Sequence, residues 1–165
     1  YWPLLFGKKF KRDTEEDGIN SLLNYGYTIL RAIVSRAVCA SGLHPTLGVF
    51  HRHRSNAFAL ADDLMEPYRP FVDHMVFQLF SRGKTKVDAE AKAYLASLAT
   101  PDLKSHVGTS PVTRQIHYFV HSVAESFETG KVQLSLPDVH SIVNLENRIA
   151  NFDQPQENND HDSLS

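Results

Sequence analysis

The sequence contains little cysteine and no long apolar run. Cys39 is its single cysteine in 165 residues, which excludes an internal disulfide. No apolar run reaches the roughly 18 residues that a membrane-spanning helix needs. These features are typical of a protein of the reducing cytoplasm, and we expect this chain to be cytoplasmic.

Alternation of apolar and polar residues, which indicates half-buried strands, is also scarce, and no internal repeat is visible. Apolar residues instead recur three and four positions apart, or form runs of helical length, and this pattern predicts an all-α fold. The segments concerned are 19–38, 71–80, 116–127 and 139–149. The same periodicity predicts that Cys39 and Phe127 lie on buried faces of their helices.

Local signals predict where the helices begin and end. Thr14, a hydroxyl residue with an acid three positions later, predicts the start of the first long helix, and Gly42 predicts its end. Pro67 and Pro70 should break or kink the next helical segment. Later boundaries are predicted at Asp88, Ser110-Pro111, Gly130 and Leu136-Pro137-Asp138.

The charge is unevenly distributed. We expect one helical domain over 1–152 and a disordered acidic and polar tail over 153–165, which holds four acids and no Lys or Arg. Residues 1–60, by contrast, hold eight basic and four acidic residues. This excess of basic residues suits a phosphate backbone, although many domains that bind no nucleic acid share it.

The segment from His51 to Arg69 holds the strongest candidate site. Asp62 and Asp63 precede Glu66 by four and three positions, so a helix could place the carboxylates on one face. An imidazole beside carboxylates suits a divalent cation, and the histidine favours Mn²⁺ over Ca²⁺. From spacing alone, this pattern is more often a solvated helix face than a metal site.

Two further features have open interpretations. Arg52 and Arg54, with the basic residues of 8–12, either hold phosphates or form a charged loop. Gly26, between Tyr25 and Tyr27, lowers helix propensity, which indicates either close approach of another backbone or plain core packing.

Four ordered motifs together carry a resemblance to a known family. They are Leu23-Asn24-Tyr25-Gly26-Tyr27, Gly42-Leu43-His44-Pro45, Leu47-Gly48-Val49-Phe50-His51 and Asp63-Leu64-Met65-Glu66-Pro67-Tyr68-Arg69-Pro70. Over roughly residues 1–80 this set resembles the spacer-acquisition integrase of CRISPR systems, and its wording is most similar to the type II branch.

The resemblance implies a helical C-terminal catalytic domain and an activity in CRISPR adaptation, the acquisition step of an antiviral defence. Members are divalent-metal-dependent DNA endonucleases and integrases, in which the 3′-hydroxyl of prespacer DNA attacks a repeat phosphodiester. The implied cofactor is Mg²⁺ or Mn²⁺. The implied partners are DNA (a prespacer duplex and the CRISPR repeat), a second copy in a homodimer, and a small CRISPR-associated partner protein (Cas two).

The resemblance also assigns roles to residues. His51 and Glu66 match metal ligands, and Asp63 matches a nearby acid of the metal site. Arg69 falls where members keep a basic residue near the phosphate, so His51, Glu66 and Arg69 form the expected catalytic set. The expected DNA contacts are Tyr25, Arg52, Arg54 and Asn56.

Two features of the family have no counterpart in this sequence: its N-terminal β domain, and a first metal-ligand Glu that precedes the aromatic pair matching Tyr1-Trp2. We therefore expect a fragment that is inactive by itself. Two alternatives are a metal-dependent phosphohydrolase of another helical family and a non-catalytic helical module that binds DNA or protein.

Overall fold

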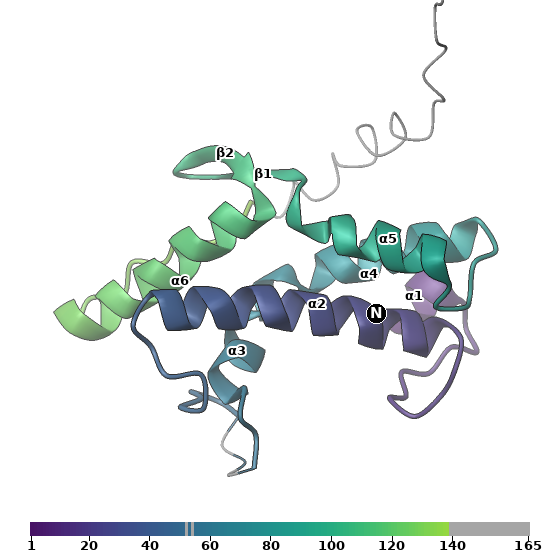
Figure 1. The fold of residues 1–165 in the computed structure, drawn as a ribbon, viewed down its shortest axis with the longest axis horizontal. Helices are drawn as coiled ribbons and strands as arrows, with labels where there is room; N and C mark the ends of the chain where they lie inside the picture. Colours follow the sequence, from purple (N-terminus) through teal and green to yellow (C-terminus); the bar gives the residue numbers. More distant parts are fainter. Residues whose placement is uncertain (52, 54, 139–165) are drawn as a thin grey trace, which may run out of the picture.

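The computed structural model describes residues 1–51, 53 and 55–138 of the chain. These residues form a mostly helical fold with one two-stranded sheet (Figure 1). The expected all-α class is thus confirmed, with the addition of a hairpin that the sequence analysis missed. In chain order the elements are α1 (Trp2–Phe6), α2 (Ile19–Ala40), α3 (Ala59–Leu64), the 3₁₀ turn η1 (Glu66–Tyr68), α4 (Arg69–Ser81), α5 (Ala89–Ala96), the 3₁₀ turn η2 (Ser97–Ala99), β1 (Asp102–Ser105), β2 (Gly108–Pro111) and α6 (Val112–Thr129).

The long helix α2 is the centre of the fold. It contacts α3, α4, α5 and α6, and Figure 1 shows it crossing the middle of the molecule. One of its faces is fully buried, at the three-and-four spacing that the sequence predicts. That face consists of Leu22, Leu23, Leu30, Val34, Ala37 and Val38.

Gly26 lets α2 and α4 approach closely. A Cβ atom at this position would lie 2.5 Å from Cγ1 of Val72 in α4, which is closer than real contacts allow. The structure therefore supports the core-packing interpretation of Gly26, since the neighbouring atoms belong to the side chains of Val72 and Leu95.

The predicted start of α2 at Thr14 is wrong, because the helix begins at Ile19. Gly18 immediately before it has φ +79°, a left-handed conformation that interrupts a right-handed helix. The end of α2 follows the prediction. Gly42 has φ +74°, and the amides of Gly42 and Leu43 bond back to the carbonyls of Cys39 and Val38 at 3.1 Å each.

Cys39 is exposed, so the prediction that it is buried is wrong. It follows Val38 directly, and one step along a helix turns a side chain by about 100°, which carries Cys39 off the buried face.

Pro67 and Pro70 divide the middle of the chain as predicted. Pro67 lies in η1, the short 3₁₀ turn that separates α3 from α4, and Pro70 stands in the first turn of α4, where a missing N–H costs nothing. Asp88 caps α5, since its carboxylate accepts a hydrogen bond of 2.8 Å from the amide of Ala91.

The hairpin of β1 and β2 pairs Asp102 with Pro111 and Ser105 with Gly108. Gln115, buried in the first turn of α6, donates from Nε2 to the Leu103 carbonyl, the Gly108 carbonyl and the Ser110 hydroxyl at 3.0–3.2 Å. This side chain ties the hairpin to α6, and all three hydrogen bonds use its amide nitrogen.

Helix α6 buries Ile116, Phe119, Val120 and Val123 as predicted. Phe127 is 61% exposed, so its predicted burial is wrong. Figure 1 shows the last part of α6 running past the end of α2, and no other helix of the described residues covers it there. The helix ends at Gly130, in the left-handed conformation that the prediction requires.

The predicted last helix after Leu136-Pro137-Asp138, with its apolar positions Val139–Ile149, and the predicted tail over 153–165 lie outside the described residues. Within the ranges that the structure describes, no helix combines the length and the apolar character needed to span a membrane.

Candidate active site

The loop between α2 and α3 carries His51 and is tied tightly to α3. Leu60 at the start of α3 donates its amide to the Pro45 carbonyl at 2.7 Å. Gly48 sits where the loop passes α3, and a Cβ there would lie 2.4 Å from the His51 carbonyl oxygen and 2.8 Å from Cβ of Ala59. Only glycine fits this turn without displacing the backbone.

Asp63 on α3 gathers the tip of this loop. Its Oδ2 accepts the amides of Val49 and Phe50 at 2.6 and 2.9 Å, and its Oδ1 accepts the amide of His51 at 3.2 Å. Oδ1 also lies 2.6 Å from Nδ1 of the His51 ring. Both oxygens of this carboxylate therefore serve the loop.

Burial alone would raise the pKa of Asp63, but the hydrogen bonds from Phe50, Val49 and both the ring and the amide of His51 outweigh it and lower that pKa. Asp63 is therefore ionised at neutral pH. An ionised acceptor places the proton of the neutral His51 ring on Nδ1 and leaves Nε2 with a free lone pair.

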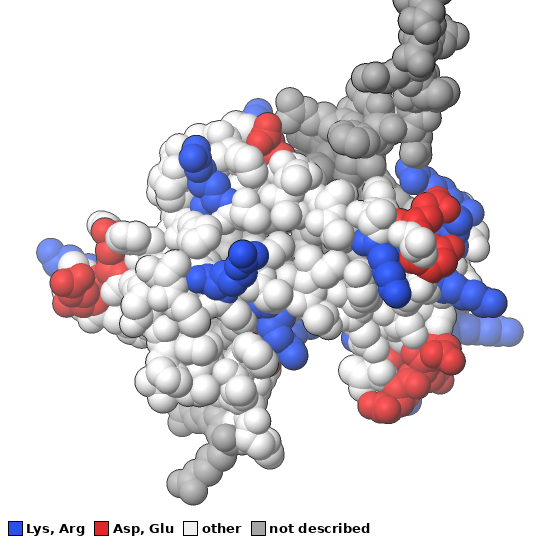
Figure 2. Space-filling view, in the orientation of Figure 1, with Lys and Arg blue, Asp and Glu red and all other residues white. Residues whose placement is uncertain are grey.

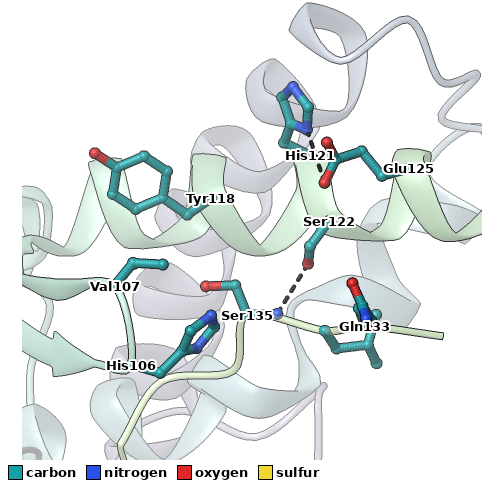
Figure 3. Close-up of a pocket in the computed structure, with 9 residues that line it drawn as sticks. His106, Val107, Tyr118, His121, Ser122, Glu125, Gln133 and Ser135 are labelled. Atoms are coloured by element: carbon teal, nitrogen blue, oxygen red, sulfur yellow. Dashed lines mark hydrogen bonds and ion pairs between the residues drawn. The ribbon is translucent and has the colours of Figure 1, made fainter.

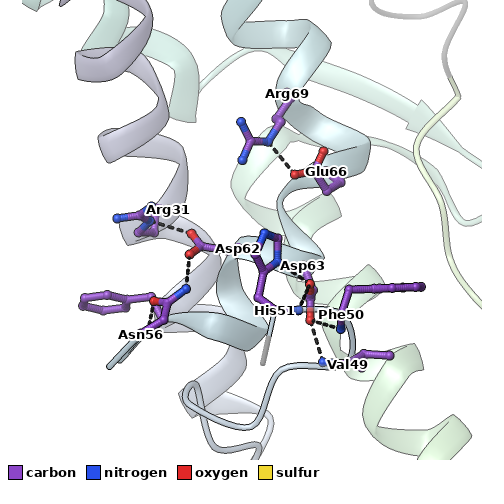
Figure 4. A network of polar contacts seen from close by, with 10 residues as sticks. Arg31, Val49, Phe50, His51, Asn56, Asp62, Asp63, Glu66 and Arg69 are labelled. Atoms are coloured by element: carbon purple, nitrogen blue, oxygen red, sulfur yellow. Dashed lines mark hydrogen bonds and ion pairs between the residues drawn. The ribbon is translucent and has the colours of Figure 1, made fainter. Parts of the chain in front are cut away.

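The two partners differ in their exposure to solvent. The His51 side chain is 46% exposed, whereas that of Asp63 is 5% exposed. The ring is thus held from below by a buried carboxylate, and its edge opposite Nδ1 faces away from Asp63 (Figure 4). This is the arrangement in which a histidine is oriented to bind a cation.

Glu66 of η1 and Arg69 at the start of α4 form a partly exposed ion pair. Arg69 Nε lies 2.7 Å from Glu66 Oε1. The contact is an ion pair without hydrogen-bond geometry, and the buried Nε–H of Arg69 has no hydrogen-bond acceptor among the described residues. The guanidinium also stacks over the Tyr27 ring, with Cζ 4.8 Å from the ring centroid. Glu66 is therefore held loosely, while Arg69 has a fixed aromatic support.

Beneath Arg69 lies a buried polar network that the sequence analysis missed. Tyr27 and Tyr1 both donate their hydroxyls to Asp73, the latter at 2.6 Å. Burial raises the pKa of Asp73 above its ordinary value, although the two hydroxyls, Arg69 and Arg12 act in the opposite direction. Burial and the neighbouring Asp73 raise the pKa of Tyr27 as well, so its hydroxyl keeps its proton.

A second network lies on the other side of α3. Arg31 of α2 donates from Nε to Asp62 Oδ1 at 2.7 Å, and Asn56 donates from Nδ2 to Asp62 Oδ2 at 2.8 Å. Asn56 Oδ1 in turn accepts the amide of Phe58 at 2.9 Å. Figure 4 shows Arg31 and Asn56 on one side of Asp62, and Val49 and Phe50 beyond Asp63.

The structure brings the predicted site residues together in pairs. His51 meets Asp63, Glu66 meets Arg69, and Asn56 meets Asp62, which is an intramolecular use of a predicted DNA contact. Tyr25 is half-buried against the core. Arg52 and Arg54, the other predicted DNA contacts, lie outside the described residues.

No group of three or more metal-ligating side chains comes together within the described part of the chain. The donor atoms that suit a divalent cation are Nε2 of His51 and the loosely paired carboxylate of Glu66. The residues therefore fit part of the ligand set of a metal and leave its further ligands to be supplied from elsewhere.

The described residues also form an open hollow of about 710 Å³ beside α6 (Figure 3). Its walls are the turn between β1 and β2, the exposed side of α6 and the segment 133–135, which Ser122 anchors by accepting the Ser135 amide at 2.9 Å. None of the predicted site residues lines it.

Comparison with known proteins adds three findings. The family model described as CRISPR associated protein Cas1 matches residues 6–105. A CRISPR-associated endonuclease Cas1 of Neisseria meningitidis serogroup C (strain 8013) is 36% identical over 129 residues, which cover 78% of this chain and 37% of that protein. A second Cas1 endonuclease, from Pyrobaculum aerophilum, is 33% identical over 121 residues, which cover 72% of this chain and 41% of that protein.

Among solved structures, a casposase bound to its integration product resembles the chain with a TM-score of 0.64 over 78% of this chain and 43% of the casposase. At 24% sequence identity this likeness concerns the fold. The chain spans less than half the length of each of these relatives.

Proposed function

The chain belongs to the Cas1 family of CRISPR-associated proteins, and we propose that it supplies the helical catalytic part of a metal-dependent DNA endonuclease and integrase. The proposed reaction inserts prespacer DNA into the CRISPR array by attack of a 3′-hydroxyl on repeat phosphodiesters. The proposed partners are prespacer and repeat DNA, a second copy of the protein and the small partner protein Cas two.

The observation that carries the proposal is the His51–Asp63 pair. A buried, ionised carboxylate fixes Nδ1 and leaves Nε2 of an exposed ring free to bind Mg²⁺ or Mn²⁺. Glu66, three residues after Asp63, is the proposed second ligand. The bound cation would act as a Lewis acid on the phosphate and on the attacking hydroxyl.

The other residues of the site act by position and charge. Asp63 orients the ring and anchors the loop, so that His51 offers a single nitrogen. Arg69, supported by the Tyr27 ring, places a guanidinium beside Glu66, where it can donate to a phosphate oxygen. His51 would ligate the cation as a neutral imidazole through Nε2.

An integration assay tests this proposal. The longer protein that contains this chain is combined with its small partner, a prespacer duplex, a plasmid bearing the repeat array, and Mn²⁺ or Mg²⁺. We expect His51→Ala and Glu66→Ala to reduce joining at least 100-fold, as loss of a metal ligand should. His53→Ala and Glu128→Ala, which change an exposed residue of the same kind, should join DNA normally.

Calorimetric titration with Mn²⁺ gives a second readout that does not depend on turnover. His51→Ala and Glu66→Ala should both weaken Mn²⁺ binding. Integration by both variants at the rate of the unchanged protein would reject the proposed site.

We also propose that the 165-residue chain is inactive by itself, since His51 and Glu66 leave part of a metal's coordination unfilled. Strand transfer by the isolated chain at the rate of the longer protein would contradict this.

One observation favours a second candidate function, a non-catalytic helical module that binds DNA or protein. The described residues do not assemble three metal ligands. Under this hypothesis Glu66→Ala and His51→Ala would leave both integration and Mn²⁺ binding unaffected, which is the opposite of the result expected above.

A further inference from the structure

Arg31 is the one charged side chain of α2 that another element holds in place. Helix α2 has no Asp or Glu, and its charged residues are Arg31 and Arg36. Figure 2 shows basic side chains without acidic neighbours over the middle of α2, whereas acidic side chains gather toward the ends of the molecule. This face is therefore basic. Arg31 is the basic residue of α2 whose side chain is held by contacts with other segments.

Two contacts fix the direction of Arg31. Its Nε donates to Asp62, whose side chain is 8% exposed, while the Arg31 side chain itself is 45% exposed. Its Cζ lies 5.9 Å from the centroid of the Phe58 ring, which supports the guanidinium from one side. Asn56 occupies the other oxygen of Asp62, so the carboxylate cannot turn away from Arg31.

These contacts use one nitrogen of the guanidinium and leave the other two. Among the residues that the structure describes, neither terminal nitrogen of Arg31 makes a hydrogen bond. An arginine that a buried acid holds through Nε, on a side chain that is 45% exposed, is pre-organised to donate from its Nη groups to the two oxygens of a phosphate, because the loss of rotamer entropy has already occurred.

We propose that Arg31 is a phosphate-contacting residue for DNA, positioned by Asp62 and Asn56. The proposal rests on the proposed function, since it adds a contact to the same DNA. Asp62 and Asp63 are consecutive in α3, and the first holds Arg31 while the second holds His51. A phosphodiester backbone that passes His51 would therefore also meet the fixed guanidinium of Arg31 on the neighbouring side of α3.

The test measures DNA binding by the 165-residue chain. Fluorescence anisotropy with a labelled duplex bearing a 3′ overhang would be recorded between about 50 and 200 mM KCl. We expect Arg31→Ala to weaken binding roughly tenfold and to lower the slope of log K against log salt by about one. Arg36→Ala is the matched control, because it removes the same charge from the same helix without a positioned side chain, and it should weaken binding less than about threefold.

Asp62→Asn separates positioning from net charge. The substitution makes the protein more basic, so a diffuse electrostatic attraction predicts tighter binding. If Asp62 positions Arg31, binding should weaken. The carboxamide has only one acceptor oxygen, so it cannot accept hydrogen bonds from both Asn56 and Arg31 as the two carboxylate oxygens do, and the Arg31 guanidinium loses its fixed position. Arg31→Lys keeps the charge, loses the Nε anchor and should also bind more weakly, which keeps the test decisive if Asp62→Asn unfolds.

If Arg31→Ala and Arg36→Ala weaken binding equally, or if Asp62→Asn tightens it, the inference fails while DNA binding stands. If the unchanged chain does not bind DNA at about 50 mM KCl, the DNA partner of the proposed function fails with it. If Arg31 instead faces an acidic protein partner, the Arg31 variants will bind DNA as the unchanged chain does, and this result also overturns the inference.

Discussion

Asp62 and Asp63 are neighbours in the chain and make contacts on two different sides of α3. Asp62 holds two side chains, one from the packed helix α2 and one from the loop. Asp63 holds three backbone amides and a histidine ring, all from the loop. The loop therefore owes its shape to Asp63, whereas Arg31 stands on a helix that would persist without Asp62.

Removal of Asp63 should have the largest effect of the substitutions that follow. Asp63→Ala leaves three amides and the His51 ring without their acceptor, and we expect a loss of about 2 kcal/mol in the free energy of unfolding. Integration by the longer protein should fall about 10- to 100-fold, as it does when the partner of a metal-binding histidine is lost.

Hydrogen exchange at the amides of Val49, Phe50 and His51 provides the direct measurement. Their protection should collapse in Asp63→Ala, because the hydrogen bonds that protect them are gone. Unchanged protection would mean that the loop does not depend on Asp63.

Gly48→Ala should disturb the packing of the same loop against α3. The added methyl group overlaps the His51 carbonyl and Ala59, so we expect a loss of about 1–3 kcal/mol in urea denaturation together with reduced integration. Gly108→Ala is the control, since its cost comes from φ +112° on the distant hairpin. If both variants reduce integration equally, the effect reflects general stability and not the loop.

Asp62→Ala should have a smaller effect on the fold. Arg31 remains on α2 and its guanidinium is solvated, so we expect a loss of about 1 kcal/mol. Exchange at Val49, Phe50 and His51 should stay as slow as in the unchanged chain. Fast exchange there would show that the two networks do not act separately.

The smallest effect concerns the dependence of stability on pH. Burial raises the pKa of Asp73, so the folded state binds this proton more readily than the unfolded state. The stability that Asp73 contributes is full below about pH 4 and is lost as pH rises through its folded pKa. Urea denaturation of the unchanged chain and of Asp73→Asn should therefore shift in favour of Asp73→Asn from pH 4 toward pH 7. Parallel curves would contradict the raised pKa.

Local patterns predicted much of the fold. The stripe of α2, its end at Gly42, the break at Pro67, the cap at Asp88 and the end at Gly130 all depend on residues within a turn or two of one another. The failures have different causes. The start of α2 and the exposure of Cys39 follow from local geometry at Gly18 and Val38, whereas the exposure of Phe127 depends on distant packing, because the end of α6 runs past the end of α2.

In the candidate site, too, contacts between residues of one local motif were predictable and contacts between distant residues were not. The motif that carries His51, Asp63, Glu66 and Arg69 is visible in the sequence, and the structure pairs these residues. Asp62 with Arg31 and Asp73 with Tyr27 are separated by 31 and 46 positions, and no local signal joins them. Such contacts become visible only when α2, α3 and α4 are packed together.

The placement of two consecutive acids on one short helix has a mechanical consequence. Their side chains leave α3 about 100° apart, so the helix cannot rotate about its axis without changing the geometry at both Arg31 and His51. The helix α3 has six residues and is held on two sides, by Asp62 to Arg31 and by Asp63 to His51. A rotation of α3 that changes one of these contacts would therefore change the other as well.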